Sequence, residues 1–412
     1  MHHRKTLASM AAIPLVAGLA LTAGPTYAKT STSFAFGASG FGTRITGGQV
    51  PVGSGTTAYK GIGCTNQAGL NRTNAVAEAT VPGLGVAHDV RTRVWTTKHH
   101  ARVASHSTHS IANIVLADAG VGTLSIDSIK STAVASHNRK GFHATTSTQV
   151  GGITFDPVVG PAQTFPAPTP DQPVTIPGLL TIYLGQNRTS HGAHSAYADA
   201  FALRVEVQAT HTSIKVAHAH AVLHSGFTGG LFSGHSDATH VITGANGTVS
   251  SGAQPLTKMP CVGTYGKTHR QSLASVDLGG QLVVNDASSQ VRGTQRAHRA
   301  HGVTRAEVGQ ITLGGQVVID GIVARAAVTR HGGHVTKSAS GTTLASVTVA
   351  GTQQVFPKTG VLEIPGIAKL ERAVVSRSRD GIRVIGLRIT LLDGSGAVIN
   401  LAEAALRIRP LH

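Results

Sequence analysis

The stretch Thr175-Ile176-Pro177-Gly178 occurs a second time in this chain, as Glu363-Ile364-Pro365-Gly366. The sequence on both sides of this stretch is repeated as well. Before it, the residues around Cys64 match those around Cys261 at an offset of 197, and after it, residues 214–219 match residues 399–404. The matched blocks keep their order, and the distance between the two copies changes only in loop-sized steps. We therefore predict one structural unit that is present in two copies.

Most of the matched blocks alternate between apolar and polar side chains. Leu203, Val205 and Val207 fall on one side of such a block, and Arg204 and Glu206 fall on the other. A period of two with many β-branched residues predicts half-buried strands, and the 50 glycines suit the turns between them. The predicted fold is all-β, with two similar β-sandwich-like domains in tandem that arise from an internal duplication. A β-solenoid is the alternative, although neither half contains a shorter repeat of about 20–30 residues.

The two copies set the predicted domain boundaries. These are a signal peptide at residues 1–28, a first β domain at 29–224, a linker with lead-in strands at 225–258 and a second β domain at 259–412. The signal peptide is predicted from a basic pair, Arg4-Lys5, from the apolar segment 7–22 and from small residues before a cut after Ala28. An N-terminal membrane anchor is the alternative, but the apolar segment is shorter than a span of about 20 residues. We expect no transmembrane segment in the remaining chain.

The charge of the chain indicates which partners it attracts. Its formal net charge is +17, although only 13% of its residues are charged. Such a balance favours non-specific attraction to acidic wall polymers, anionic lipid or nucleic acid. Lysines and arginines are scattered, however, with no run longer than two, as on a solvated basic surface. Aromatic residues are only 4%, too few for stacking platforms for bases or sugars. We expect cell-wall polymers or other envelope components as partners, and no specific nucleic acid.

The two cysteines, Cys64 and Cys261, occupy equivalent positions in the two copies. In an exported chain an even number of cysteines suggests disulfide bonding. Equivalent positions of two facing domains can meet across a pseudo-twofold axis, so we predict a bond between these two residues. Free or intermolecular thiols are an alternative. A redox role is a third possibility, although the chain has no Cys-x-x-Cys motif.

Histidine is unusually frequent, with 23 residues. His218 and His220 are two residues apart, so on a strand both point to the same face, and His224 follows closely. Because neutral imidazole binds Zn²⁺, Cu²⁺ and Ni²⁺ well, these three are the candidate metal ligands. Glu403 replaces His218 in the second copy, which is typical of a variable, solvent-facing position. The alternatives are histidines that simply fill polar surface positions, and a surface whose positive charge grows as the pH falls toward about 6.

Several blocks of the second half together carry a family resemblance. They are residues 311–322, 340–344, 364–366, 386–389 and 399–404. This pattern resembles the choice-of-anchor P proteins, which are secreted, β-rich surface proteins of actinobacteria with a variable C-terminal anchoring device. The resemblance extends over residues 36–224 and 232–408. It implies an exported protein that is associated with the envelope or released, and it supplies no site residues. The chain departs from the family in showing no anchoring signal.

No motif in the chain predicts a defined chemistry, since Gly-x-Ser-x-Gly and His-Glu-x-x-His are both missing. Our first hypothesis is therefore a secreted, non-enzymatic β protein with a structural or adhesive role, extracellular or loosely associated with the cell wall. The second is a secreted metal- or ligand-binding protein that uses surface histidines. The third is a secreted hydrolase. We expect no cofactor.

Overall fold

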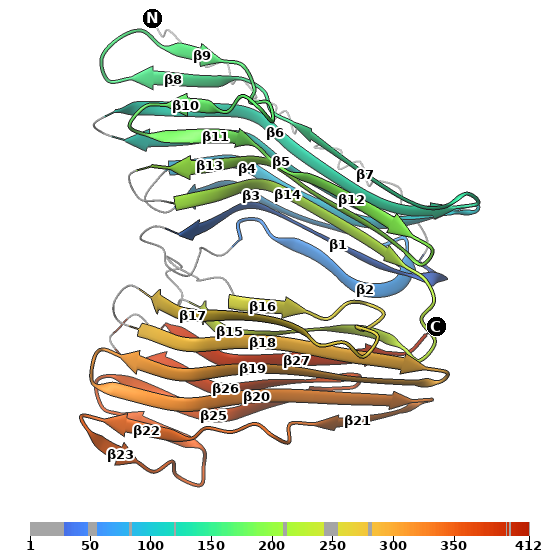
Figure 1. The fold of residues 1–412 in the computed structure, drawn as a ribbon, viewed down its shortest axis with the longest axis vertical. Coiled ribbons are helices and arrows are strands. Elements are labelled where there is room, and N and C mark those ends of the chain that lie inside the picture. The colour runs from blue at the N-terminus through green and yellow to red at the C-terminus, as the bar shows by residue number, and fades with distance from the viewer. Residues whose placement is uncertain are drawn as a thin grey trace, which may run out of the picture.

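The computed structural model describes most of the chain and is built from β-strands (Figure 1). The described residues are 29–47, 56–81, 85–118, 121–208, 212–242, 254–278, 282–392, 394 and 397–411. All regular elements within these ranges are strands, so the all-β prediction is confirmed. Among the same residues there is no helix long and apolar enough to cross a membrane. The predicted signal peptide, residues 1–28, lies outside the described residues.

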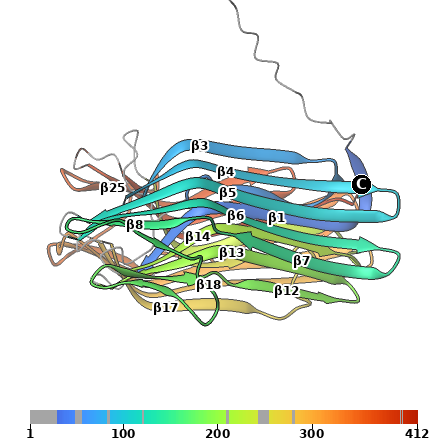
Figure 2. The same ribbon diagram turned by 90° about the horizontal axis from the view of Figure 1, so that it is seen from above.

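The first half of the chain forms two seven-stranded antiparallel sheets that pack face to face (Figures 1 and 2). Sheet A has the order β10-β11-β13-β14-β1-β2, with β12 beside β13, and sheet B has the order β3-β4-β5-β6-β8-β9, with β7 beside β6. The strands of sheet A are β1 (Thr30–Gly47), β2 (Lys60–Ala68), β10 (Val174–Ile176), β11 (Leu180–Leu184), β12 (Asn187–Gly192), β13 (Ser195–Val207) and β14 (Thr212–His224). Those of sheet B are β3 (Asn71–Val81), β4 (Gly85–His99), β5 (Arg102–Asp118), β6 (Gly122–Asn138), β7 (Gly141–Gln149), β8 (Ile153–Pro157) and β9 (Gln163–Phe165).

The second half builds the same sandwich again. Sheet A′ has the order β16-β15-β27-β26-β25-β24, and sheet B′ has the order β17-β18-β19-β20-β22-β23, with β21 beside β20. The strands of sheet A′ are β15 (Leu231–Ile242), β16 (Gln254–Lys258), β24 (Val361–Ile364), β25 (Ala368–Ser378), β26 (Gly381–Leu391) and β27 (Val398–Arg409). Those of sheet B′ are β17 (His269–Leu278), β18 (Leu282–Arg296), β19 (Arg299–Leu313), β20 (Val317–His331), β21 (His334–Ser338), β22 (Ser346–Val349) and β23 (Thr352–Gln354).

The two halves share one strand order, except that β25 alone in sheet A′ takes the place of β11 and β12 in sheet A, and a shared order is the outcome expected of a duplicated domain. Strands β1, β2 and β14 of sheet A correspond to β15, β16 and β27 of sheet A′. The β-solenoid alternative is wrong, because the ladders of the described strands are antiparallel and close into two sandwiches instead of stacking as coils. Strands β15 and β16 lie within the range 225–258, so the second sandwich begins in the segment predicted as linker and lead-in strands. Residues 243–253 of that segment lie outside the described residues.

The repeated Ile-Pro-Gly stretch forms the same tight turn in both halves. Between β10 and β11, the Leu179 N–H donates to the Ile176 carbonyl at 3.1 Å, which closes a four-residue turn. Gly178 and its counterpart Gly366 have φ angles of 76° and 72°. A type II turn favours proline at its second position and needs a residue with positive φ, normally glycine, at its third. The repeated Pro-Gly pair supplies both residues.

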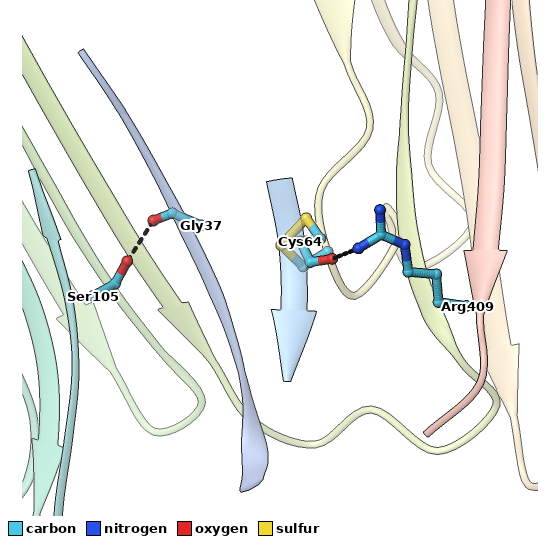
Figure 3. The surroundings of a disulfide bond; sticks show 5 residues. Gly37, Cys64, Ser105 and Arg409 are labelled. Carbon is cyan, nitrogen blue, oxygen red and sulfur yellow. Dashed lines mark hydrogen bonds between the residues drawn. A yellow bond between two sulfur atoms is a disulfide. The ribbon is translucent and has the colours of Figure 1, made fainter. Parts of the chain in front are cut away.

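The core of the first sandwich is interrupted by a polar band. The β5 side chains that face sheet A are, in order, Val103, Ser105, Ser107, His109 and Ile111, all of them buried. The two apolar end residues belong to separate clusters, and the polar residues lie between them. Ser105 satisfies its hydroxyl by donating to the Gly37 carbonyl of β1 at 2.7 Å (Figure 3). In the second sandwich the corresponding core is one continuous apolar cluster.

The two sandwiches meet along β2 and the start of the second copy (Figure 1). The predicted Cys64–Cys261 disulfide is present, with a Cα–Cα distance of 5.2 Å. Arg409 Nη1 donates to the Cys64 carbonyl at 3.4 Å beside it (Figure 3). Ala35 and Leu231 pack with the two cysteines in a small apolar cluster. Within the described residues, a covalent bond, a charged hydrogen bond and a small apolar cluster therefore contribute to the junction.

Candidate functional site

Strand β14 places His218 and His220 on the outer face of sheet A. Their neighbours Ala219 and Ala221 belong to the core, so the histidines point away from it. Asp199 of β13 lies beside them: its Oδ1 is 2.8 Å from His218 Nε2 and 3.3 Å from His220 Nδ1. The two-residue spacing thus brings both imidazoles to one carboxylate oxygen. Their ring centroids are 6.4 Å apart and the rings are nearly parallel.

The third candidate ligand, His224, lies at the end of β14. It follows His220 by four residues on the same face, which is roughly 13 Å along a strand. Burial lowers the pKa of His224 to about 4, and the charge of His220 lowers it further. The structure therefore brings together His218, His220 and Asp199, and it leaves His224 too far from them to share one ion.

The charge state of this group follows from its contacts. Burial acts to raise the pKa of Asp199, but the hydrogen bond from His218 and the nearby His220 ring outweigh it and hold that pKa well below its usual range. Burial lowers the pKa of His218, although Asp199 opposes the shift. Phe41 stacks on the His218 ring with a centroid distance of 4.5 Å. At neutral pH the group is an ionised carboxylate beside a neutral His218 that is covered by an aromatic ring.

Sheet A′ carries a different polar group at the equivalent positions. In sheet A, His218 lies opposite Phe41 of β1, and in sheet A′, Glu403 lies opposite Asp237 of β15. Ala217 and Ala402, the residues before His218 and Glu403, both have positive φ angles, of 54° and 51°, which fixes the correspondence. The duplication has therefore placed a carboxylate pair where the first copy has a histidine and a phenylalanine.

The group on sheet A′ contains one imidazole and two carboxylates. His235 Nε2 lies 3.4 Å from Asp237 Oδ1 and 3.4 Å from Glu403 Oε1. One ligand atom from each of the three residues can be chosen so that all lie within 4.8 Å of one another. Arg383 of β26 holds Glu403 through two hydrogen bonds, both of 2.6 Å. We call His235, Asp237 and Glu403 the A′ triad.

The two carboxylates of the A′ triad are both buried, but they differ in their hydrogen-bond donors and in their pKa values. Asp237 is 1% exposed and Glu403 is 3% exposed. Burial acts to raise the pKa of Glu403, but hydrogen bonds from His235 and Arg383 lower it to about 2. Burial is the main cause that raises the pKa of Asp237 to about 7; the positive charges of His235 and Arg383 oppose this shift and the Glu403 charge supports it. Neither oxygen of Asp237 has a hydrogen-bond donor within the described part of the chain.

The expectation that Glu403 is a variable, solvent-facing residue is wrong, because its side chain is buried and paired with Arg383. One signal for this group is present in the sequence. His235 and Asp237 are two residues apart, so they share a face of one strand. Nothing in the sequence indicates that β27 pairs with β15 in the register that brings Glu403 opposite Asp237.

His109 is a buried titratable group in the polar band of the first sandwich. Thr92 donates its hydroxyl hydrogen to the Ala58 carbonyl at 2.7 Å, so it can only accept from His109 Nδ1, which lies 2.7 Å away. The proton of the neutral ring is therefore on Nδ1, and Nε2 is buried without a partner in the described residues. Burial lowers the pKa of His109 to about 3, with a smaller contribution from His218.

The outer face of sheet B′ carries a row of arginines. Arg270, Gln290, Arg305 and Arg325 lie side by side on β17, β18, β19 and β20, each opposite the next in the strand register. Their neighbours Thr304 and Ala306 on β19 are buried, so the row points outward. Three guanidinium groups thus occupy four adjacent positions, which span about 14 Å across the sheet. We call Arg270, Arg305 and Arg325 the arginine row.

The charge of the arginine row is only partly balanced. Glu307 forms an ion pair with Arg305 and lies 4.0 Å from Arg270. On the same sheet, burial lowers the pKa of His301, and the positive charges of Arg299, Arg325 and Arg292 lower it further. This face therefore has an excess of positive charge.

No protein-family model and no curated protein sequence matches this chain. Its function is therefore inferred from the two sandwiches, the A′ triad, the Asp199 group and the arginine row.

Proposed function

We propose that this chain is a secreted, non-enzymatic β protein that acts as a structural or adhesive module, extracellular or loosely associated with the cell wall. It attaches to anionic polymers of the envelope through the arginine row. The disulfide between the sandwiches favours an oxidising compartment, and the net charge of +17 favours acidic partners. The resemblance to the choice-of-anchor P proteins points to the same location.

The arginine row is the observation that carries this proposal. Arg305 and Arg325 lie directly opposite each other on paired strands, an arrangement in which like charges destabilise a sheet. The single negative charge of Glu307 cannot neutralise three guanidinium groups. A linear polymer with phosphate or carboxylate groups supplies the missing charge, because guanidinium binds both groups through two parallel hydrogen bonds. Repeated contacts of this kind give adhesion without any chemical step.

Binding to purified bacterial cell wall tests the proposal. The wild-type chain, a triple R270Q/R305Q/R325Q variant and a control with the same loss of charge are sedimented with wall at increasing NaCl concentrations. The control is K98Q/R139Q/K140Q, three exposed residues of the first sandwich. Counterion release predicts that losing three phosphate contacts lowers the slope of log K against log salt by roughly two to three. If the control loses as much binding as the triple variant, net charge alone explains the attachment and the proposal fails.

A second candidate function, binding of a metal ion or small ligand, is favoured by the Asp199 group. Two imidazoles there converge on one carboxylate oxygen, and imidazole is a good ligand for Zn²⁺ or Cu²⁺. Titration calorimetry with Zn²⁺ on the wild type and on H218A/H220A tests whether the Asp199 group binds the ion. Saturable binding below about 10 μM that disappears in the variant supports this function, and binding that persists in the variant contradicts it.

A further inference from the structure

We propose that the A′ triad is a binding site for a divalent transition-metal ion of the zinc type. The three side chains come from two directly paired strands: His235 and Asp237 from β15, and Glu403 from β27. Strand β15 is itself held between β16 and β27, so the ligands stand on a rigid part of the sheet. Ligands on paired strands are held in place before the ion arrives.

The two distances from His235 to the carboxylates of the A′ triad fit tetrahedral zinc. Zinc binds imidazole nitrogen at about 2.0–2.1 Å and carboxylate oxygen at about 2.0–2.2 Å, and two such atoms at a tetrahedral angle lie about 3.3–3.5 Å apart. His235 Nε2 lies 3.4 Å from an oxygen of Asp237 and 3.4 Å from an oxygen of Glu403. Ligand atoms of all three residues lie within 4.8 Å of one another, so side-chain movements can bring the two carboxylates to a single ion beside His235.

The unsatisfied Asp237 is the independent observation that points to a cation. Its side chain is 1% exposed, and both of its oxygens lack a hydrogen-bond donor in the described part of the chain. A buried carboxylate in that condition costs free energy unless a proton or a cation neutralises it. The fold does not need a carboxylate at this position, because the first sandwich has Phe41 at the equivalent place.

Arg383 and His235 define how an ion would enter and be held. Arg383 bonds to both oxygens of Glu403, which keeps that carboxylate ionised and oriented. The His235 side chain is 39% exposed, so the triad is reached from solvent along this residue. With Asp237 and Glu403 ionised and Arg383 protonated, the group has a net charge of −1, which attracts a divalent cation.

The ligand set also decides between classes of ion. Ca²⁺ takes six to eight oxygen ligands and Mg²⁺ prefers octahedral oxygen and water, and the A′ triad offers one nitrogen and two carboxylates. Zn²⁺, or Co²⁺ as its spectroscopic substitute, accepts a mixed nitrogen and oxygen set in tetrahedral geometry. A fourth coordination position remains for water. The site is independent of the arginine row, which lies on sheet B′.

The test uses the full chain with its disulfide intact, freed of metal by a chelator and titrated with Zn²⁺ and Co²⁺ at pH 7.5. We expect saturable binding at the A′ triad, a tetrahedral Co²⁺ spectrum and a rise in melting temperature with Zn²⁺. D237N keeps the shape of the side chain and should weaken the affinity by at least about tenfold. H99A/H100A, which removes two exposed histidines of the first sandwich, should leave affinity and spectrum unchanged.

Three results would overturn the proposal. The first is a wild-type chain without saturable binding below about 100 μM. The second is a D237N variant that keeps the wild-type affinity. The third is loss of binding in H218A/H220A with D237N unaffected, which assigns the ion to the Asp199 group instead. Melting curves of every variant without metal show whether it is folded, so that a loss of binding is not mistaken for unfolding.

Discussion

Replacing Asp237 with asparagine should change how the stability of the protein depends on pH. In the folded chain the pKa of Asp237 is raised to about 7, mainly by burial, from an ordinary value of 3.8. Between these two values the folded state keeps a proton that the unfolded state has released. The folded state therefore binds more protons, and its stability falls as the pH rises from about 4 to about 7.

The size of this effect follows from the pKa difference. Each pH unit within the window changes the free energy of unfolding by about 1.4 kcal/mol for one such group. Because the slope flattens as the pH approaches the folded pKa of about 7, the contribution of Asp237 should fall by about 2 kcal/mol between pH 5 and pH 7. The side chain is 1% exposed, so solvent screening reduces this value little. An asparagine side chain does not titrate, so the D237N variant lacks the loss.

The measurement is urea unfolding of wild type and D237N, followed by far-UV circular dichroism at pH 5, 6 and 7 in the presence of a chelator. The stability of D237N relative to wild type should rise steadily across this range. Saturating Zn²⁺ should remove most of the loss in the wild type, because the ion neutralises Asp237 in place of the proton. Parallel pH profiles of the two proteins would refute the reasoning, since they would show that Asp237 is not held in an unfavourable buried environment.

Three further perturbations test other parts of the structure. The C64S/C261S variant loses a cross-link over 197 residues. Its free energy of unfolding in urea should therefore fall by up to about 5 kcal/mol. An unchanged free energy of unfolding would show that the bond does not constrain the unfolded chain. Burial is the main cause that lowers the pKa of His109 from 6.5 to about 3. Between these values the unfolded state is protonated and the folded state is not. His109 should therefore lower the free energy of unfolding by about 1.4 kcal/mol per pH unit as the pH drops from 6.5 toward 3. The acid slope of an H109Q variant should be shallower than that of the wild type by this amount, and equal slopes would contradict the assignment. G366A should cost about 1 kcal/mol in thermal unfolding because φ is 72° at this turn, whereas G333A, a turn residue with open space around it, should cost little.

The all-β class, the repeated unit and the disulfide could be predicted from the sequence alone, and particular residues show why. The repeated Ile-Pro-Gly stretch marks a turn whose backbone conformation admits few other residues, so both copies of it remain recognisable. Leu203, Val205 and Val207 alternate with polar residues because β13 has one face in the core. Cys64 and Cys261 lie at equivalent places in two halves that face each other, which is why their pairing could be predicted.

The candidate sites were harder to predict, because they depend on strand pairing over long distances. His218 and His220 share a face by their spacing alone, but the carboxylate that joins them, Asp199, comes from the neighbouring strand. Asp237 and Glu403 are far apart in the sequence and meet only through the register of β15 with β27. The arginine row likewise forms across strands that follow one another in the chain, so no run of basic residues reveals it. The replacement of His218 by Glu403 between the two copies does not by itself indicate that the Glu403 side chain is buried.

Fractionation of producing cells tests the central claim, adhesion of a secreted protein to anionic envelope polymers, most directly. Medium, wall and membrane fractions are probed for the wild-type chain and for R270Q/R305Q/R325Q, and the wall is then washed with increasing salt. We predict that the wild type is retained by the wall and released by high salt, and that the triple variant is found in the medium. A wild type that stays in the cell, or a triple variant that remains bound to the wall as firmly as the wild type, would contradict the proposed function.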